Sequence, residues 1–430
     1  MGDTVTSSQP PDHGFDARGV LSPELVDLQP GDEGAVITSV ETYALAVPLR
    51  QDIADATVGL RSWIVPVVEI GTADGRIGTG ISGVHCAPEL LCDVVSNHYA
   101  PVLLGAASDD ILGTWKRLYW LPTHWIGRAG VVHMALGMVD IALWDLAAQR
   151  AELPLWKLLG GTADPVETYN TDGGWLNLGI DDVIRDLLSL VDQGWRRVKI
   201  KVGSHDWRED AHRVRAVRKA IGDGIALMCD ANQRWDFASA MRLLPVLDEV
   251  QMDWIEEPLH ADDLEGHARL QRASHRDVAA GESLYSYHSF AGFIAADAMR
   301  VVQVDATRVG GVTEWLQVAQ HASARGLRVV PHAGDMMQVH QHLAGTSLTE
   351  VPALVEFIPW TQDAFVNRSV VADGYVERPQ APGASTAIKS TARQSWQMRG
   401  IGSCHASAET TRTANVSHRR RKERSNERAD

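Results

Sequence analysis

Ionisable residues recur at an even spacing through the second half of the 430-residue chain, each near the end of a short apolar run. Successive members lie between 23 and 29 residues apart, which is about the length of one strand–helix unit. A single acid at a strand end is most often a helix cap or half of a surface ion pair. A series of seven is different, because burying charges together is costly unless something binds them. The series consists of Lys201, Asp230, Glu256, Glu282, Asp305, His332 and Glu356.

Three acids on consecutive units, Asp230, Glu256 and Glu282, would form a site made only of oxygen ligands. Oxygen ligands with room for water suit Mg2+, whereas zinc prefers His or Cys. We therefore expect one Mg2+ ion per subunit at these carboxylates. Asn232, two residues after the first acid, is a candidate substrate contact.

Two candidate bases flank this site. Strand geometry places Lys199 and Lys201 on the same face, and we expect Lys199 to lower the pKa of Lys201 by like-charge repulsion. On the other side, Asp305 would hold the imidazole of His332 in one tautomer and raise its basicity. A base with a pKa near neutral on each side of a metal ion predicts acid–base chemistry on a bound molecule.

Such a set suits removal of the proton α to a carboxylate. The enolate that results is dianionic, and positioned acid–base groups alone supply only about 10²–10⁴-fold of rate. The remainder has to come from electrostatic stabilisation of the enolate oxygens, which a metal ion and a lysine supply. The predicted substrate is therefore a small-molecule carboxylate.

The elements that position these residues alternate between strands and helices from about residue 161 to 360. Amphipathic helices lie between the apolar runs, and eight such units in about 200 residues favour an α/β fold of the (β/α)8-barrel type, with one strand closing the barrel imperfectly. Catalytic groups of such a barrel lie at the carboxyl ends of its strands. The eight predicted strands are Val166–Asn170, Arg197–Val202, Leu227–Asn232, Val250–Pro258, Val278–Ser283, Val301–Ala306, Arg328–His332 and Leu354–Pro359.

The residues outside this range have other characters. Residues 35–160 begin with two strand-like runs joined by a Gly-bearing turn and continue with helical patterns, the last spanning 131–161, which predicts an α+β unit. Residues 1–34 are rich in Pro, Gly, Asp and Ser and are predicted to be a disordered leader. Residues 386–430 contain SHRRRKERSNERAD and are predicted to be a disordered basic tail.

Composition excludes several classes. The formal charge of −15 would repel nucleic acid from most of the surface, and the basic run at the end is expected to be simply solvated. Four cysteines without paired spacing favour a reducing compartment. Neither a signal-like leader nor about 18 uninterrupted apolar residues is present, so we expect a cytoplasmic protein without membrane or nucleic-acid partners.

From about Val36 to Ser385 the chain resembles the mandelate racemase/muconate-lactonizing enzyme family of the enolase superfamily. Any one of the matching segments would be weak evidence alone, but together they are specific. They are ALGMVDIALWDLAAQRAELPLWKLLGG, the KIK pair, DAN, IEEP, GES, VDATRVGGVTEW, the histidine of PHAGD, and VEF. The basic tail matches nothing in that family.

The resemblance implies roles for the parts already singled out. Residues 35–160 would be a capping domain over the barrel of residues 161–360, and residues 361–385 would return to pack on the cap. Asp230, Glu256 and Glu282 would bind Mg2+, Lys201 assisted by Lys199 would be one base, and His332 with Asp305 the other. Glu356 would hydrogen-bond the substrate carboxylate. The family commonly forms homo-oligomers.

Members with both bases include racemases and dehydratases of sugar acids. The runs HAGDMMQVHQHL and TDGGWLN look more like the dehydratases, which give a 2-keto-3-deoxy acid. A racemase or epimerase of a 2-hydroxy acid and a non-catalytic metabolite-binding scaffold are the alternatives. Candidate substrate contacts in the cap are His124, Trp125, Arg61 and Asp55, a mixture that favours polyols. Of His340 and His342, we expect one to face solvent.

Overall fold

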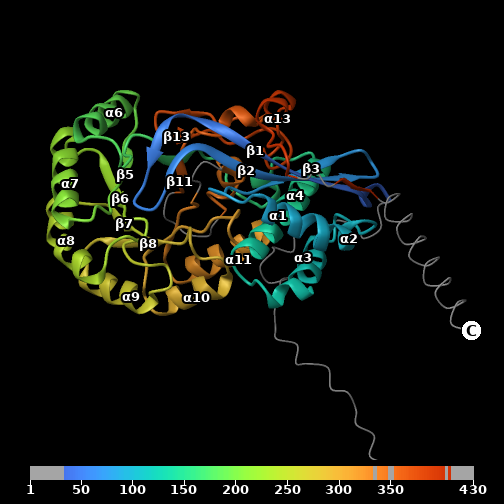
Figure 1. The fold of residues 1–430 in the computed structure, drawn as a ribbon, viewed down its shortest axis with the longest axis horizontal. Coiled ribbons are helices and arrows are strands. Elements are labelled where there is room, and N and C mark those ends of the chain that lie inside the picture. The colour runs from blue at the N-terminus through green and yellow to red at the C-terminus, as the bar shows by residue number, and fades with distance from the viewer. Residues whose placement is uncertain (1–32, 333–336, 347–352, 402–404, 408–430) are drawn as a thin grey trace, which may run out of the picture.

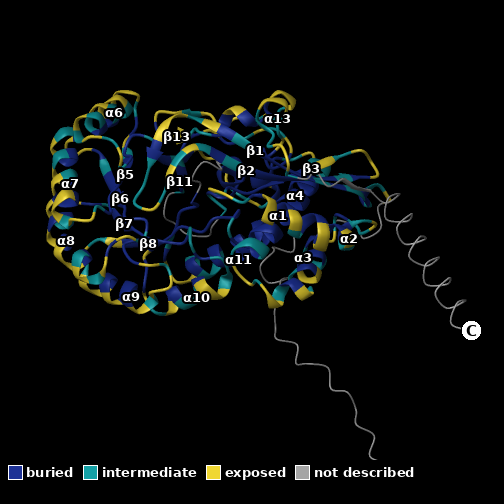
Figure 2. Cartoon of the chain, viewed as in Figure 1, coloured by how far each residue is buried: buried dark blue, intermediate teal, exposed yellow. Residues whose placement is uncertain are grey.

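The computed structural model describes residues 33–332, 337–346, 353–401 and 405–407. The predicted leader, apart from residues 33 and 34, and residues 408–430 of the predicted tail lie outside these ranges. Within them, an antiparallel sheet with helices lies beside a ring of strand–helix units (Figure 1). Buried residues line the strands, and exposed ones gather on the outer surfaces of the helices (Figure 2).

The N-terminal unit is built on a four-stranded antiparallel sheet in the order β14-β1-β2-β3. The long β1–β2 hairpin loses its regular register between Pro48 and Ile53 and ends in a turn at residues 55–58. The elements of this unit are η2 (Glu33–Ala35), β1 (Ile37–Ala54), β2 (Gly59–Thr72), β3 (Ile77–Ile81), α1 (Glu89–Val94), the π-helix η3 (Val95–Tyr99), α2 (Ala100–Leu103), α3 (Ile111–Tyr119), η4 (Pro122–Trp125), α4 (Val131–Arg150) and α5 (Leu155–Leu158).

Helix α4 packs directly on strand β3 because two glycines let the backbones approach. A Cβ atom on Gly80 would lie 1.8 Å from the carbonyl oxygen of Met138, and one on Gly78 would lie 2.3 Å from that of Ala142. By length and composition α4 is apolar enough to cross a membrane, but 89% of its most apolar window is buried within the protein. It is therefore placed as a core helix.

The expectation of one helix over residues 131–161 is wrong. Helix α4 ends at Arg150, and the chain re-enters a helix only at Leu155. Glu152 takes a positive φ of 53°, and Pro154 follows, which has no N–H with which to continue a helical ladder. The predicted end does hold for α5, since Gly160 adopts a positive φ of 75° beyond it.

The barrel prediction is confirmed, with eight parallel strands that overlap the eight predicted runs but are shorter than most of them. They are β4 (Val166–Asn170), β5 (Arg197–Lys201), β6 (Ala226–Asp230), β7 (Trp254–Glu256), β8 (Asp277–Ala280), β9 (Val301–Val302), β10 (Arg328–Val329) and β11 (Leu354–Phe357). The helices between them are α6 (Ile180–Asp192), α7 (Trp207–Ile221), α8 (Phe237–Glu249), α9 (Leu264–Ala273), α10 (Tyr287–Ala295), α11 (Gly311–Ala324) and α12 (Met337–Leu343).

Ring closure is uneven. Each neighbouring pair from β4 to β10 is hydrogen-bonded in parallel, and β11 pairs in parallel with β4. The described residues show no ladder between β10 and β11. In addition, β13 (Tyr375–Val376), which pairs with β12 (Val371–Ala372), adds antiparallel to the beginning of β4. Among the described residues, the ring is thus not closed by strand pairing between β10 and β11.

After the barrel the chain returns to the N-terminal sheet. Phe365, which follows η5 (Gln362–Ala364), and Ala392 of α13 (Ser390–Trp396) pack in the core formed by β1 and β2. Strand β14 (His405–Ser407) adds to the free edge of β1. The prediction that disorder begins at residue 386 is therefore wrong for this part. Its apolar residues are few and scattered, so the sequence pattern alone did not reveal where they would be buried.

Candidate active site

The seven predicted residues of the even series converge at the carboxyl ends of the barrel strands. Parallel pairing sets the first three side by side, since Lys201 pairs with Asp230 and Asp230 with Glu256 in register. Glu282, Asp305 and His332 lie two to three residues beyond β8, β9 and β10, and Glu356 lies within β11. Ligand atoms of Asp230, Glu256 and Glu282 all lie within 4.8 Å of one another.

The lysines of β5 both point into the barrel, as strand alternation predicts, while Ile200 between them packs in the outer core. Lys199 is 1% exposed, and its Nζ donates to both carboxylate oxygens of Glu256 at 2.7 and 2.8 Å. It also lies 2.8 Å from Oε1 of Glu356. Lys201 Nζ donates to Oδ2 of Asp230 at 2.6 Å.

The expected low pKa of Lys201 is not found. Burial lowers this pKa most, and Lys199 lowers it further, but Asp230 raises it, and the net result is a pKa above the ordinary value. The prediction failed because it counted the neighbouring lysine and not the carboxylate in contact with the ammonium. In this state Lys201 is a cation and cannot accept a proton.

His332 and Asp305 form the predicted pair. The Nδ1–H of His332 donates to Oδ2 of Asp305 at 2.8 Å, and its Nε2 lies 2.7 Å from Oε2 of Glu282 and 3.6 Å from Oε2 of Glu356. Burial lowers the pKa of His332, but Glu282 and Asp305 raise it well above its usual value. The imidazole of His332 thus lies between Glu282 and Asp305, and its hydrogen bond to Asp305 orients it.

The charges of this cluster do not balance without a further cation. Its five carboxylates, on Asp230, Glu256, Glu282, Asp305 and Glu356, face three cations, which are Lys199, Lys201 and protonated His332. With all of these groups ionised the formal net charge is −2, and burial raises the pKa of Glu256 to about 7, which shows that this charge is unfavourable unless it is compensated. A divalent ion on the three clustered carboxylates would neutralise it, and an all-oxygen donor set fits Mg2+.

A polar layer beneath the cluster holds Glu256. Gln303 Nε2 donates to its Oε2 at 2.6 Å and to the hydroxyl of Tyr169 at 3.2 Å, and Trp254 Nε1 donates to the same carboxylate at 3.3 Å. Thr171 donates to Oε1 of Glu356 at 2.7 Å in a similar way. Tyr169, Trp254 and Gln303 were not predicted because they lie in apolar segments outside the matching motifs, and Thr171 opens the TDGGWLN run without a spacing that would mark it as a contact of Glu356.

A pocket of about 140 Å³ opens beside the cluster, between the barrel and the N-terminal unit. Every side chain that lines it can hydrogen-bond. They are Asp55, Thr57 and His85 from the N-terminal unit, and Asn232, Gln233, Glu257, Glu282, Ser283 and Arg308 from the barrel loops. Asn232 is 7% exposed and its Oδ1 has no hydrogen-bond partner, so it offers an acceptor to a bound molecule.

The turn of the β1–β2 hairpin carries Asp55 and Thr57 to this pocket. Asn177, in the loop after β4, accepts from the backbone N–H of Ala54 at 2.8 Å and donates to the carbonyl of Asp52 at 3.1 Å. The N–H of Leu176 donates back to the carbonyl of Ala54 at 2.9 Å. Barrel and hairpin are thereby joined at the pocket rim.

Three of the predicted contacts from the N-terminal unit are not among the residues that line this pocket, whereas Asp55 is. Arg61 pairs with Asp52 at 3.0 Å, and its side chain is 86% exposed. His124 packs on the rings of Tyr119 and Trp120, and Trp125 is 85% exposed. Arg61 lies at the start of β2 and His124 and Trp125 lie in the short η4, and the sequence pattern of these segments does not say which side chains face the barrel.

The histidines of α12 also correct the prediction, because both are buried. His342 Nδ1 accepts from the N–H of Trp156 at 3.2 Å, and its Nε2 lies 2.9 Å from the hydroxyl of Ser385. His340 Nε2 accepts from the N–H of Ala306 at 2.9 Å. Neither faces solvent.

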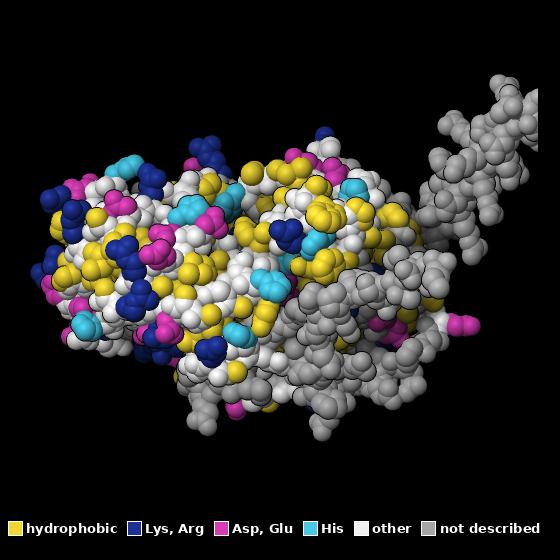
Figure 3. Space-filling model, turned by 90° about the horizontal axis from the view of Figure 1, so that it is seen from below, with side chains coloured by type: hydrophobic (Ala, Val, Ile, Leu, Met, Phe, Trp, Pro, Cys, Tyr) yellow, Lys and Arg dark blue, Asp and Glu magenta, His cyan; other side chains and the backbone are white. Residues whose placement is uncertain are grey.

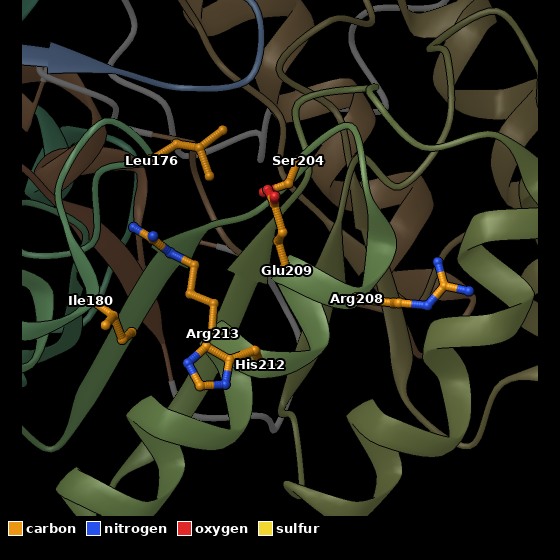
Figure 4. A pocket seen from close by; sticks show the side chains of 7 residues that line it. All are labelled: Leu176, Ile180, Ser204, Arg208, Glu209, His212 and Arg213. Atoms are coloured by element: carbon orange, nitrogen blue, oxygen red, sulfur yellow. The ribbon is translucent and has the colours of Figure 1, made fainter.

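A larger cavity of about 440 Å³ lies on the outside of the barrel, between α6, α7 and the loops that follow β4 and β5. Leu176 and Ile180 lie on one side of it, and the guanidinium of Arg213 extends from α7 toward them and donates to the carbonyls of Trp175 and Leu178, while the guanidinium of Arg208 points away (Figure 4). It includes none of the clustered acids or bases. On the face seen in Figure 3, basic, acidic and histidine side chains are interspersed among hydrophobic ones. The chemistry is therefore placed at the smaller pocket.

Comparisons with known proteins show which family the chain resembles. Residues 36–160 match the family described as mandelate racemase/muconate lactonizing enzyme, N-terminal domain, and residues 182–392 match the family described as enolase C-terminal domain-like. L-talarate/galactarate dehydratase of Salmonella typhimurium is 36% identical over 80% of this chain and 86% of its own. A 3,6-anhydro-alpha-L-galactonate cycloisomerase of Streptomyces coelicolor is 33% identical over 81% of this chain and 96% of its own. A crystal structure of the Salmonella dehydratase, liganded with Mg and L-lyxarohydroxamate, superposes with a TM-score of 0.80 at 33% identity and covers 86% of this chain and 94% of that one.

Proposed function

The chain belongs to the mandelate racemase/muconate lactonizing enzyme family of the enolase superfamily, and from this membership we propose that it is a Mg2+-dependent hydro-lyase that dehydrates a sugar acid. The reaction begins with removal of the proton α to the substrate carboxylate. Loss of the C3 hydroxyl as water and tautomerisation then give a 2-keto-3-deoxy acid. The substrate class is that of aldonic and aldaric acids.

The observation that carries this proposal is the lining of the pocket beside the acid cluster. Each of its side chains is a hydrogen-bond donor or acceptor, and they come from both the barrel and the N-terminal unit. A polyol chain offers a hydroxyl to such groups at every carbon, whereas an aryl group would leave them buried without partners. The pocket therefore favours a sugar acid over a mandelate-like substrate.

Asp230, Glu256 and Glu282 would hold the metal ion, since their oxygens cluster within 4.8 Å and a cation there would offset their negative charge. When bound, Mg2+ supplies electrostatic stabilisation of the negative charge that develops on the substrate carboxylate. Lys199, which lies between Glu256 and Glu356, is placed to add a positive charge at the same place. Asn232 and Glu356 would contact the substrate hydroxyls and carboxylate.

Lys201 and His332 are the proposed acid–base pair. They come from β5 and from the loop after β10, which lie on opposite sides of the ring. One of them takes the C2 proton, at Nζ or Nε2, and the electrons of the C–H bond pass to the carboxylate as an enolate. The C3–O bond then breaks, and an acid proton leaves with the hydroxyl as water. Asp305 orients His332 throughout.

A racemase or epimerase of a 2-hydroxy acid is the second candidate, because two bases on opposite faces can also return the proton to C2 from the other side. It uses the same residues and lacks only the leaving group. A non-catalytic scaffold has less support, since a binding protein has no need of two complete base assemblies. We further propose a cytoplasmic location and a homo-oligomer, which rest on cysteine usage and on the family resemblance.

The test is turnover of a panel of sugar acids by the purified protein with Mg2+. Aldonic and aldaric acids and mandelate would be incubated and the products followed by NMR. We expect a 2-keto-3-deoxy acid from at least one sugar acid, and none after chelation or in the Lys201→Ala variant. Inversion at C2 without loss of water would favour the racemase instead. No reaction with any member would contradict the proposal for these substrates.

A further inference from the structure

His340 lies beside Asp305 of the His332–Asp305 pair and is not among the residues that line the pocket or form the carboxylate cluster. It comes from α12, the helix that follows β10, and is 0% exposed. Its Nε2 accepts from the N–H of Ala306 at 2.9 Å and lies 3.1 Å from Oδ1 of Asp305. The buried Nε2 of His340 is therefore within hydrogen-bonding distance of two groups in the turn that carries Asp305.

That turn follows the end of β9, where two backbone hydrogen bonds still reach it from the sheet, from the N–H of Gln303 to the carbonyl of Ala280 at 2.9 Å and from the N–H of His332 to the carbonyl of Val304 at 3.3 Å. The ladder of β9 ends at Val302, so Asp305 lies three residues beyond the last paired strand residue. Its Oδ1 accepts from the N–H and the hydroxyl of Thr307, both at 2.7 Å, which leaves Oδ2 for Nδ1 of His332. The N–H of Ala306, next in the chain, is a buried donor whose acceptor is His340.

The two contacts of Nε2 are alternatives, because one ring nitrogen cannot accept a hydrogen bond and donate one simultaneously. If Nε2 accepts from Ala306, His340 fixes the backbone of the turn. If Nε2 carries a proton, it donates to Asp305 and fixes the carboxylate itself. In both states His340 adds to the two bonds from Thr307 in fixing Asp305, and Asp305 orients the His332 ring through its hydrogen bond.

We infer that His340 is a positioning residue for one base only. It acts through Asp305 on His332, whereas Lys201 is held by β5 and Asp230 and has no contact with α12 among the described residues. Loss of His340 will therefore impair proton transfer on the His332 face of C2 and spare the Lys201 face. The inference rests on the proposed function, since it assigns a part in that same proton transfer.

The test compares C2 proton exchange in D2O with Mg2+ on two C2-epimeric sugar acids. The epimer whose exchange is lost in His332→Ala defines the His332 face, and the one lost in Lys201→Ala defines the Lys201 face. In His340→Leu we expect exchange on the His332 face to fall about tenfold, as for loss of one buried hydrogen bond, and on the Lys201 face to change by less than about twofold. His340→Gln, which restores an acceptor, will recover part of the loss.

His342→Gln is the matched control, because it alters a buried histidine of the same helix that contacts Trp156 and Ser385 instead. It should leave the ratio of the two faces unchanged. A cycle with Asp305→Asn adds a second readout, since the two changes will be non-additive if His340 acts through Asp305. Equal loss on both faces, or additive effects, would overturn the inference. Absence of exchange in the unaltered protein would overturn the proposed function and this inference with it.

Discussion

Lys201 Nζ lies 2.6 Å from Oδ2 of Asp230, so a proposed base is held by a proposed metal ligand. This contact keeps the lysine protonated, because the carboxylate stabilises its charge. A metal ion on Asp230, Glu256 and Glu282 would compete with Lys201 for the carboxylate of Asp230. Metal binding and the freeing of the base are thus coupled through one carboxylate.

Mg2+ should stabilise the folded protein, since it offsets a buried net negative charge. At a Mg2+ concentration 100-fold above the Kd, the linkage contributes about 2.7 kcal/mol and raises the Tm. We expect this shift in a thermal melt of the unaltered protein and its loss in Asp230→Asn. Glu249→Gln is the control, because Glu249 pairs with Arg215 at the surface. An equal Mg2+ shift in Asp230→Asn would count against the assigned site.

Lys199→Met should destabilise the metal-free protein more than the Mg2+-loaded one. The substitution leaves Glu256 and Glu356 buried without their cation, and breaking a buried pair in this way costs about 3–5 kcal/mol. Mg2+ on Glu256 would restore part of the compensation. Urea unfolding midpoints with and without Mg2+ measure the difference, with exposed Lys219→Met as control. A midpoint unchanged in the absence of metal would contradict this reading of the cluster.

Asn177→Ala should weaken substrate binding without touching the substrate. It removes two of the three hydrogen bonds that join the hairpin turn to the barrel loop, so Asp55 and Thr57 are held less firmly in the pocket. We expect KM to rise about thirtyfold, in line with about 1 kcal/mol for each of the two bonds, and kcat to change little. Steady-state kinetics measures KM and kcat of this variant, and Gln193→Ala, a change at an exposed residue, is the control. A fall in kcat at constant KM would contradict the claim that the turn contributes to substrate binding.

Asp140 predicts a pH dependence of stability. Burial raises its pKa from 3.8 to about 7 in the folded protein, although the hydrogen bonds from Thr313 act in the opposite direction. Between these values the folded protein retains a proton that the unfolded chain has released, so this group makes stability fall as pH rises from about 4 to about 7. Asp140→Asn removes this titration.

The free energy of unfolding of Asp140→Asn should therefore fall less steeply across that window than that of the unaltered protein. Asp145→Asn serves for comparison, because burial raises the pKa of Asp145 to about 6 and its contribution ends at a lower pH. Denaturant midpoints at several pH values give the slopes. Parallel curves for Asp140→Asn and the unaltered protein would refute the assignment.

The sequence predicted site residues correctly where ionisable residues recur at the spacing of one strand–helix unit. Each charged residue of the series marks a strand end, and parallel strands bring their carboxyl ends together, so the cluster of Asp230, Glu256 and Glu282 was predictable without coordinates. Strand alternation likewise placed both lysines of β5 on one face. The roles of these residues stay predictions, but their meeting in space is observed.

What depends on contacts between distant segments was not predictable. Gln303 reaches Glu256 across 47 residues, and Asn177 reaches the hairpin turn across more than 120. The choice of Asp55 over Arg61 as a pocket residue depends on how the hairpin turn docks, which no local pattern encodes. The same holds for α13, whose few apolar residues are buried only because the N-terminal sheet offers them a surface.

The central claim is that the barrel mouth removes the proton α to a carboxylate. Its most direct test is incubation of the unaltered protein with Mg2+ and a sugar acid in D2O, followed by NMR of the recovered substrate and product. We predict deuterium at C2 of the substrate or loss of that proton with formation of the 2-keto-3-deoxy acid, both abolished in the Lys201→Ala/His332→Ala double variant. A C2 proton retained throughout a panel of aldonic and aldaric acids would contradict the account.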